Sequence, residues 1–149
     1  MIMVSKRGWR LYGVQSKDVP LIWDELLPMI RRVVGLEYSC DTEKSLLTEI
    51  LCQNYQLWLG FTPSGKIGLV FITTIEVRPR YKACVVLYAA GEKPREWLEF
   101  SKAVTLWAKQ KNCQRLEVCG RKGWVRVLQR IGFEPVTHVL QKVIKDGRQ

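Results

Sequence analysis

The sequence lacks the features of a membrane-spanning or secreted protein. Its longest nearly apolar run, Ile67 to Ile75, is far shorter than the roughly 20 residues that cross a bilayer. The first ten residues hold no apolar segment followed by a small-residue cleavage site, so a secretory signal is not expected. We therefore expect a cytoplasmic protein with no membrane partner.

Cysteine and histidine occur in numbers that fit neither a disulfide framework nor a zinc site. The five cysteines are odd in number, and no two of them form a C-x-x-C pair. His138 is the only histidine, so a zinc site would need ligands scattered along the chain. We expect free thiols in a reducing compartment and no metal cofactor.

Acidic residues are scarce relative to basic ones. The chain has 24 Lys and Arg against 14 Asp and Glu, a net charge of +10. This balance favours anionic partners, such as nucleic acids, phosphorylated ligands or an anionic membrane surface. The basic residues form no single block, and the alternative is a charge that serves solubility and non-specific polyanion binding.

No linker, internal repeat or low-complexity tract interrupts the 149 residues. That length predicts one domain over residues 1–149. The apolar fraction of 47% is typical of a globular protein. A chain of this size buries about 70% of its unfolded surface and needs no disulfide or metal to hold a core.

Hydrophobic periodicity predicts a mixed succession of helices and strands. Ile67–Val77 is apolar on both alternating faces, which predicts a central strand covered on both sides. The predicted elements are a strand at Arg10–Val14, a helix through Val19 to Val33, a short helix starting at Asp41 or Thr42, strands at Tyr55–Thr62, Ile67–Val77 and Lys82–Ala89, a helix from Pro94 through Ala108, a strand at Arg115–Val118, a helix at Trp124–Ile131 and a final strand at Pro135–Ile144.

This order, β-α-α-β-β-β-α-β-α-β, predicts an α/β (α+β) domain with a mixed sheet. The three middle strands should form an antiparallel meander. Strand Lys82–Ala89, the helix that follows and strand Arg115–Val118 make one parallel crossover in a mostly antiparallel sheet.

The element order and two segments resemble the GNAT superfamily of acyl-CoA-dependent N-acyltransferases. GRKGWVRVLQRIGFE, from Gly120 to Glu134, is similar to the family's penultimate helix and the Gly-Phe turn after it. Together with the segment from Gln56 to Gly91, it resembles short GNAT-like proteins of phages and prophages, some of them virion-associated. The resemblance implies a GNAT-like fold, acetyl-CoA as cofactor and N-acetyl transfer as activity. The phage subgroup implies the host cytoplasm or the virion as location, and phage structural proteins as partners.

The resemblance places the cofactor's pyrophosphate at the loop after strand Lys82–Ala89, where free N–H groups and a helix N-terminus attract anions. The family pattern there is Arg or Gln, two residues, Gly, one residue, and Gly or Ala. This chain has a single glycine at the place and carries Glu92 and Glu96, which repel phosphate. The candidate cofactor-binding residues are Ala89, Ala90, Gly91, Lys93, Arg95 and Arg121.

The family's proton-donating Tyr maps to Leu128, which has no proton to give. Tyr88, at the end of its strand, is an alternative proton donor. The other interpretation is that its ring packs in the core while its hydroxyl contacts water. Glu76 is the candidate base, because a carboxylate among apolar neighbours has a raised pKa and can deprotonate an amine. The alternative for Glu76, and for Glu117 in the later strand, is an ion pair with Arg78 or Arg115.

A basic group surrounds the loop and helix after Gly120. Arg126 and Arg130 are four residues apart and lie on one helix face. Arginines beside an exposed aromatic suit phosphate contact and base stacking. The candidate nucleic-acid residues are Arg121, Lys122, Trp124, Arg126 and Arg130. The alternative is a solvated helix face with Trp124 turned into the core.

Two functions from different classes follow. One is an N-acetyltransferase that uses acetyl-CoA. The other is a non-catalytic GNAT-fold protein that serves as a phage structural, virion-associated or nucleic-acid-binding component. Six tryptophans leave room for both a core and an oligomer interface.

Overall fold

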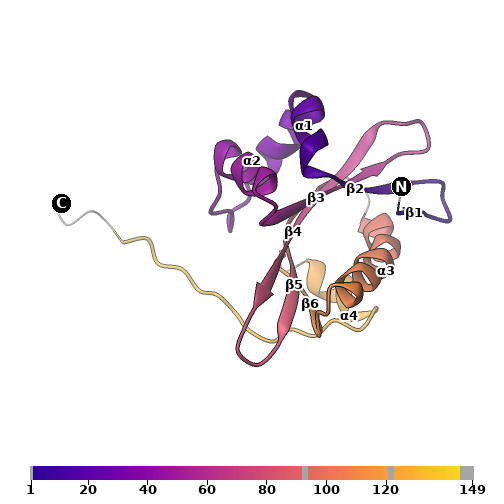
Figure 1. Cartoon of the computed structure of the whole chain (residues 1–149). Coiled ribbons are helices and arrows are strands. Elements are labelled where there is room, and N and C mark those ends of the chain that lie inside the picture. Colours follow the sequence, from indigo (N-terminus) through magenta and orange to yellow (C-terminus); the bar gives the residue numbers. More distant parts are fainter. Residues whose placement is uncertain (1, 92–93, 121–122, 145–149) are drawn as a thin grey trace.

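The computed structural model describes residues 2–91, 94–120 and 123–144 (Figure 1). Their strands form a six-stranded sheet in the order β1-β2-β3-β4-β5-β6. Neighbouring strands are antiparallel up to β5, and β5 and β6 are parallel. The strands are β1 (Met3–Val4), β2 (Arg10–Val14), β3 (Tyr55–Phe61), β4 (Ile67–Val77), β5 (Lys82–Gly91) and β6 (Arg115–Val118).

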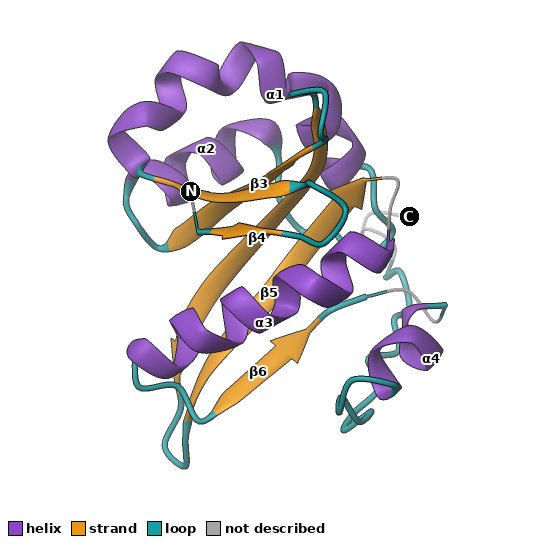
Figure 2. Ribbon diagram, turned by 90° about the vertical axis from the view of Figure 1, so that its right-hand side faces the viewer, coloured by secondary structure: helices purple, strands orange, loops and turns teal. Residues whose placement is uncertain are grey.

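Helices cover both faces of this sheet (Figure 2). Helices α1 (Val19–Val34) and α2 (Glu43–Leu51) pack on one face, and the short 3-10 turn Ser16–Asp18 leads into α1. Helices α3 (Pro94–Gln110) and α4 (Trp124–Gln129) pack on the other. The mixed α/β class, the antiparallel meander and the single parallel crossover predicted from the sequence are confirmed.

Local signals explain the helix boundaries. Pro20 lies in the first turn of α1, where its missing N–H costs no hydrogen bond, and Gly35 ends the helix. At the start of α2, the Ser45 N–H donates to Thr42 Oγ1 at 3.0 Å, and the Thr42 N–H donates to Ser45 Oγ at 2.9 Å. This reciprocal pair satisfies two N–H groups that the first helical turn leaves free.

The sheet separates two apolar cores. The α3-side core consists of Trp9, Leu11, Trp58, Leu69, Phe71, Cys84, Val86, Trp97, Phe100, Val104, Ala108 and Leu128. The α1-side core consists of Val19, Leu26, Ile30, Val33, Leu46, Ile50, Leu57, Leu59, Val70, Ile72, Tyr88 and Ala90. Strand β4 contributes alternate side chains to both, which confirms the prediction that Ile67–Val77 is a central strand covered on both faces.

Three aromatic rings form the centre of the α3-side core. Phe71 stacks on Trp58 with ring centroids 5.5 Å apart, and meets Trp97 edge-to-face at 4.9 Å. The Trp58 indole N–H donates to Thr73 Oγ1 at 3.0 Å, so its one polar group is paired inside the core. Trp58 and Trp97 are therefore core residues.

The structure differs from the sequence prediction at both ends of the chain. The N-terminus adds β1, a two-residue strand that pairs with β2. The final strand predicted at Pro135–Ile144 does not join the sheet in the part of the chain that the structure describes. That segment is extended and exposed along its whole length. None of the described helices is both long and apolar enough to cross a membrane.

Replacing Phe71 with alanine should destabilise the protein strongly, because the ring is fully buried between two tryptophans. We expect the free energy of unfolding to fall by about 3–5 kcal/mol, the range typical of buried Phe-to-Ala changes. Urea denaturation followed by tryptophan fluorescence measures it. The control is Leu106→Ala, on the exposed side of α3, which should cost far less. Equal losses in the two variants would contradict the assigned core.

Candidate functional site

Strands β5 and β6 separate part-way along their length. They pair from Ala83 with Arg115 to Val86 with Val118, and the Cys119 N–H donates the last hydrogen bond to the Val86 carbonyl at 2.9 Å. Strand β5 continues to Gly91 with β4 as its only described partner. Figure 2 shows the two strands diverging beyond this point. The edge of β5 from Leu87 to Gly91 is therefore open toward a gap, which we call the β5–β6 gap.

A β-bulge stands where the gap begins. Ile72 pairs with Tyr88 and Thr73 pairs with Val86, so Leu87 is one extra residue in β5. Before the bulge, Cys84 and Val86 face the α3-side core; after it, Tyr88 and Ala90 face the α1-side core. Tyr88 thus faces the loop between α1 and α2.

Tyr88 is tied to that loop by hydrogen bonds. Its hydroxyl donates to Asp41 Oδ2 at 2.6 Å and accepts from the Cys40 N–H at 3.3 Å. The Tyr55 hydroxyl donates to the same Asp41 oxygen at 3.4 Å. Burial, together with the bond to Asp41, raises the pKa of Tyr88 well above its usual value. Burial and the Asp41 carboxylate raise the pKa of Tyr55 to about 12.

A second polar network lies near the start of β5. Arg78 binds both oxygens of Glu117, with Nη1–Oε2 and Nη2–Oε1 distances of 2.8 and 2.9 Å. Its Nε donates to Glu76 Oε2 at 3.0 Å. The Arg78 bonds lower the pKa of Glu117 and raise that of Arg78 itself. Glu76 and Glu117 thus both bind Arg78, as in the ion-pair alternative, while Arg115 stacks over the Tyr81 ring at 3.7 Å.

The two predicted catalytic residues are separated along the sheet. Tyr88 lies opposite Ile72 of β4, and Glu76 is four residues further along that strand. At about 3.3 Å per residue, this spacing is about 13 Å. Cys119 follows β6 directly, at the mouth of the gap, and the residue is exposed. Its sulfur is nonetheless partly shielded from solvent, and this desolvation, with the negative charges of Glu117 and Glu76, raises the pKa of the thiol.

Three predicted cofactor residues line the end of β5. Ala89 is half-buried against the α3-side core, and Ala90 is buried in the α1-side core. A Cβ on Gly91 would come within 2.6 Å of the Gly68 carbonyl oxygen and 3.0 Å of Leu69 Cα. Close contact with β4 therefore requires glycine here. A bulky substitution at Gly91 would strain the sheet, so it does not test cofactor binding alone.

The first turn of α3 carries side chains of both charge signs. Arg95 is exposed, as phosphate binding requires. Glu96 is 3% exposed, and its Oε2 atom has no hydrogen-bond partner among the described residues. A carboxylate at this position opposes an anion on the helix end. Lys93 and Arg121, also predicted to bind the cofactor, lie outside the described residues.

The predicted nucleic-acid residues are described in part. Arg126 and Arg130 are exposed at α4. Trp124 is half-buried and packs against the α3-side core, so its ring is not fully available for base stacking. Lys122, like Arg121, lies outside the described residues. His138 is exposed on the extended C-terminal segment.

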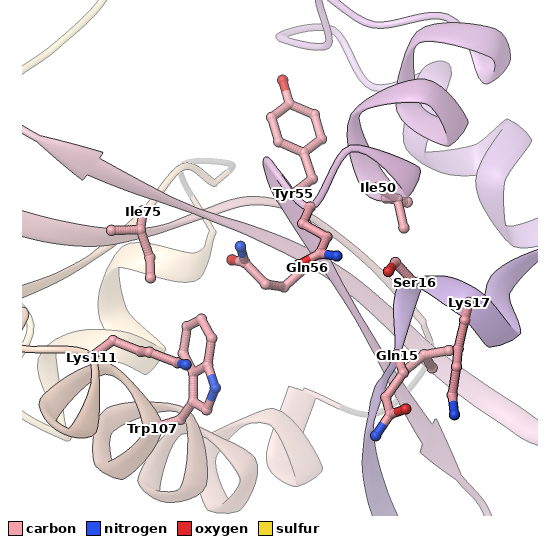
Figure 3. Close-up of a pocket in the computed structure, with 11 residues that line it drawn as sticks. Gln15, Ser16, Lys17, Ile50, Tyr55, Gln56, Ile75, Trp107 and Lys111 are labelled. Atoms are coloured by element: carbon pink, nitrogen blue, oxygen red, sulfur yellow. The ribbon is translucent and has the colours of Figure 1, made fainter.

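A separate cavity of about 620 Å³ lies between the start of β3 and the end of α3 (Figure 3). Gln56, Trp107 and Lys111 line it, together with residues of the turn before α1. None of the residues predicted to bind cofactor or catalyse transfer lines this cavity. In the described part of the chain, no group of three or more His, Cys, Asp or Glu residues is placed to hold a metal ion.

Several solved structures with the same arrangement are named as acetyltransferases. An aminoglycoside 6′-N-acetyltransferase from Acinetobacter baumannii superposes with a TM-score of 0.64 at 13% identity, over 94% of this chain and 100% of that one. The chain has the GNAT fold. A GCN5-related N-acetyltransferase from Ralstonia eutropha JMP134 gives a TM-score of 0.63 at 14% identity, over 91% and 99% of the two chains.

A predicted acetyltransferase from Clostridium acetobutylicum, solved with acetyl-CoA, gives a TM-score of 0.62 at 15% identity, over 91% and 96% of the two chains. At these identities the likeness establishes the GNAT fold and no more. No family model and no curated protein matches the sequence. The resemblance to phage proteins therefore stays a prediction.

Replacing Arg78 with methionine should flatten the acid dependence of stability. The pKa of Glu117 is lowered in the folded protein, so this carboxylate stabilises the fold above the ordinary pKa of 4.5 and loses that effect as the pH falls. We expect Arg78→Met to lower the free energy of unfolding at pH 7 only modestly, since the pair is partly exposed to solvent. The difference from wild type should vanish at acidic pH.

Urea denaturation from neutral to acidic pH measures this difference. Arg80→Met is the control, because Arg80 is an exposed arginine of the same turn with no described ion pair. A wild-type pH profile in the Arg78 variant would show that the network does not stabilise the fold.

Proposed function

We propose that the chain is an N-acetyltransferase that binds acetyl-CoA in the β5–β6 gap and acetylates an amine. The observation that carries the proposal is the divergence of β5 from β6 within a GNAT fold. The open edge of β5 offers backbone N–H and C=O groups to an extended ligand, as a sheet edge does to an added strand. The arm of acyl-CoA contains two amide groups and suits such an edge.

The residues around the gap suggest how the ligand is held. Small side chains at Ala89 and Ala90 keep the end of β5 narrow, and exposed Arg95 is placed to meet phosphate. Because Glu96 is buried in the same turn, we assign the phosphate contact to the Arg95 side chain rather than to the helix end. Acetyl-CoA supplies a thioester carbonyl that an amine can attack.

The acceptor amine belongs on the α1 side of the sheet. Asp41, whose described side-chain partners are hydroxyl groups and not a cation, places negative charge there, which attracts a protonated amine. For transfer, the protonated amine first loses one proton, and its nitrogen then bonds to the thioester carbon. The carbon–sulfur bond breaks to release a thiolate, and the nitrogen gives up its second proton, which passes to the thiolate or to water. We propose Glu76, directly or through a water molecule, as the base that takes the proton.

Tyr88 then has a positioning role. Its hydroxyl proton is engaged by Asp41, and its raised pKa makes it a weak proton donor toward a thiolate. By fixing Asp41 and the α1–α2 loop to β5, Tyr88 holds the acceptor side of the gap in place. Leu128, at the place of the family's Tyr, is buried in the α3-side core.

Calorimetric titration with acetyl-CoA at physiological salt tests the proposal. ATP controls for general anion binding, and desulfo-CoA shows whether the sulfur contributes. We expect micromolar binding of acetyl-CoA. Cys119→Trp, which fills the mouth of the gap, should weaken it at least about tenfold, or 1.4 kcal/mol. The matched Cys119→Ala variant should bind as wild type does. Equal, weak binding of every polyanion would overturn the acyltransferase proposal.

We propose polyanion binding at α4 as a second candidate, supported by the exposed Arg126 and Arg130 and the net charge of +10. The double variant Arg126→Ala/Arg130→Ala should weaken DNA or RNA binding. It should also reduce the slope of log affinity against log salt by about 2, one unit per lost phosphate contact. Fluorescence anisotropy at several salt concentrations measures both. The control is Lys102→Ala/Lys109→Ala, which changes two exposed lysines of α3. An unchanged salt slope would remove this candidate.

A further inference from the structure

The cavity between the start of β3 and the end of α3 has a positively charged lining. Its volume of about 620 Å³ lies in the range of about 300–1,000 Å³ that is typical of small-molecule sites. Lys17 and Lys111 line it, and none of the described lining residues is acidic. Figure 3 shows the two lysines on opposite sides of the cavity. Neither forms an ion pair with a described residue, so both charges are available to an anion.

Gln56 presents hydrogen-bond donors to this cavity. The Trp58 indole N–H donates to Thr73 Oγ1 at 3.0 Å, and the Thr73 hydroxyl donates to Gln56 Oε1 at 2.8 Å. Because an indole nitrogen can only donate, the direction of this chain is fixed, and Gln56 Nε2 keeps its two N–H groups. No described residue accepts from Nε2. In Figure 3 the Gln56 amide lies between Ile75 and Trp107, where its donors suit the oxygens of an anion.

Gln53 lines the same cavity in a backbone conformation that favours glycine. Its φ is 64°, in the left-handed region. Just past the end of α2, the Gln53 N–H donates to the Ile50 carbonyl at 3.0 Å and the Asn54 N–H donates to the Glu49 carbonyl at 2.9 Å. These two bonds form a Schellman motif, whose left-handed position is usually glycine. A glutamine in this strained position, beside a cavity, points to a function for its amide group.

Trp107 gives the cavity an aromatic wall. The residue is half-buried, and its ring meets Trp58 edge-to-face with centroids 5.3 Å apart, which holds it in place. Lys111 Nζ lies 5.9 Å from the centroid of the Trp107 ring. An apolar surface beside a cation suits a ligand that carries a ring next to its negative group.

We propose that this cavity binds a small organic phosphate ester, either a nucleoside monophosphate or a sugar phosphate. A phosphate monoester carries a charge of about −1.5 to −2 and three acceptor oxygens, which matches two ammonium groups and amide donors. Lys17 and Lys111 neutralise the phosphate, and Gln53 and Gln56 donate to its oxygens. Trp107 packs against the base or the sugar. None of these residues lies at the β5–β6 gap, so this ligand binds independently of acetyl-CoA.

Calorimetric titration of the full chain with AMP and with glucose 6-phosphate tests the proposal. Inorganic phosphate, adenosine and glucose are the comparison ligands. We expect one ester to bind at least about tenfold more tightly than inorganic phosphate and than its own unphosphorylated part. The ester that does so identifies the ring that the cavity accepts. Its affinity should persist at saturating desulfo-CoA. Displacement by desulfo-CoA, or esters that bind no more tightly than inorganic phosphate, would overturn the proposal.

Gln53→Gly separates binding from folding. The change relieves the left-handed strain, so the melting temperature should equal or exceed that of the wild type. The affinity for the ester should fall at least about fivefold, because a hydrogen bond to a charged group is lost. Asn112→Gly is the matched control: Asn112 has a φ of 63° in the same motif after α3 and does not line the cavity. Unchanged affinity in Gln53→Gly would refute the assigned site.

The lysines are tested by Lys17→Met/Lys111→Met, which removes two charges from the cavity. We expect this variant to bind the ester at least about tenfold more weakly, since both ammonium groups contact the phosphate. The control is Lys102→Met/Lys109→Met, which removes two exposed lysines of α3 that do not line the cavity. Equal losses in the two double variants would mean general attraction by the net charge and would overturn the proposal.

Discussion

Strand β5 can satisfy its backbone hydrogen bonds on both sides only as far as Val86. Beyond that residue β6 turns away, and one edge of β5 is left without a strand. Backbone N–H and C=O groups need partners, so this edge must meet water, a ligand or another chain. The β5–β6 gap, the placement of Ala89 to Gly91 and the proposed ligand site all depend on this one interrupted ladder.

The two polar networks lie on either side of that interruption. Asp41 holds the α1–α2 loop to β5 on one side of the bulge, and Arg78 gathers Glu76 and Glu117 near the other end of the strand. Glu76 and Glu117 are balanced by Arg78 and by Arg115, which stacks over Tyr81, whereas the described side-chain partners of Asp41 are the hydroxyls of Tyr55, Tyr88 and Ser45. A carboxylate without a described cation beside it suits an amine better than it suits a phosphate.

The sequence allowed much of this fold to be predicted because many of its signals are local. The bounds of β4 and the start of α2 follow from apolar continuity and from the Thr42–Ser45 pair. The ion pair of Glu76 was foreseen as an alternative because Arg78 is two residues away. The bond between Asp41 and Tyr88 was not, because 47 residues separate them and neither belongs to a motif. The β5–β6 gap could not be predicted for the same reason, since the point at which two strands diverge is set by pairing between distant segments.

The bulge at Leu87 also bears on how this strand can change in evolution. Val86 and Tyr88 pair with consecutive residues of β4 and face opposite cores, so without Leu87 they would be ordinary neighbours in a regular strand. Deleting the Leu87 codon would therefore keep Tyr88 on the α1 face, opposite Ile72 and beside Asp41. One codon can thus be gained or lost at this point while every side chain after it stays with its own core.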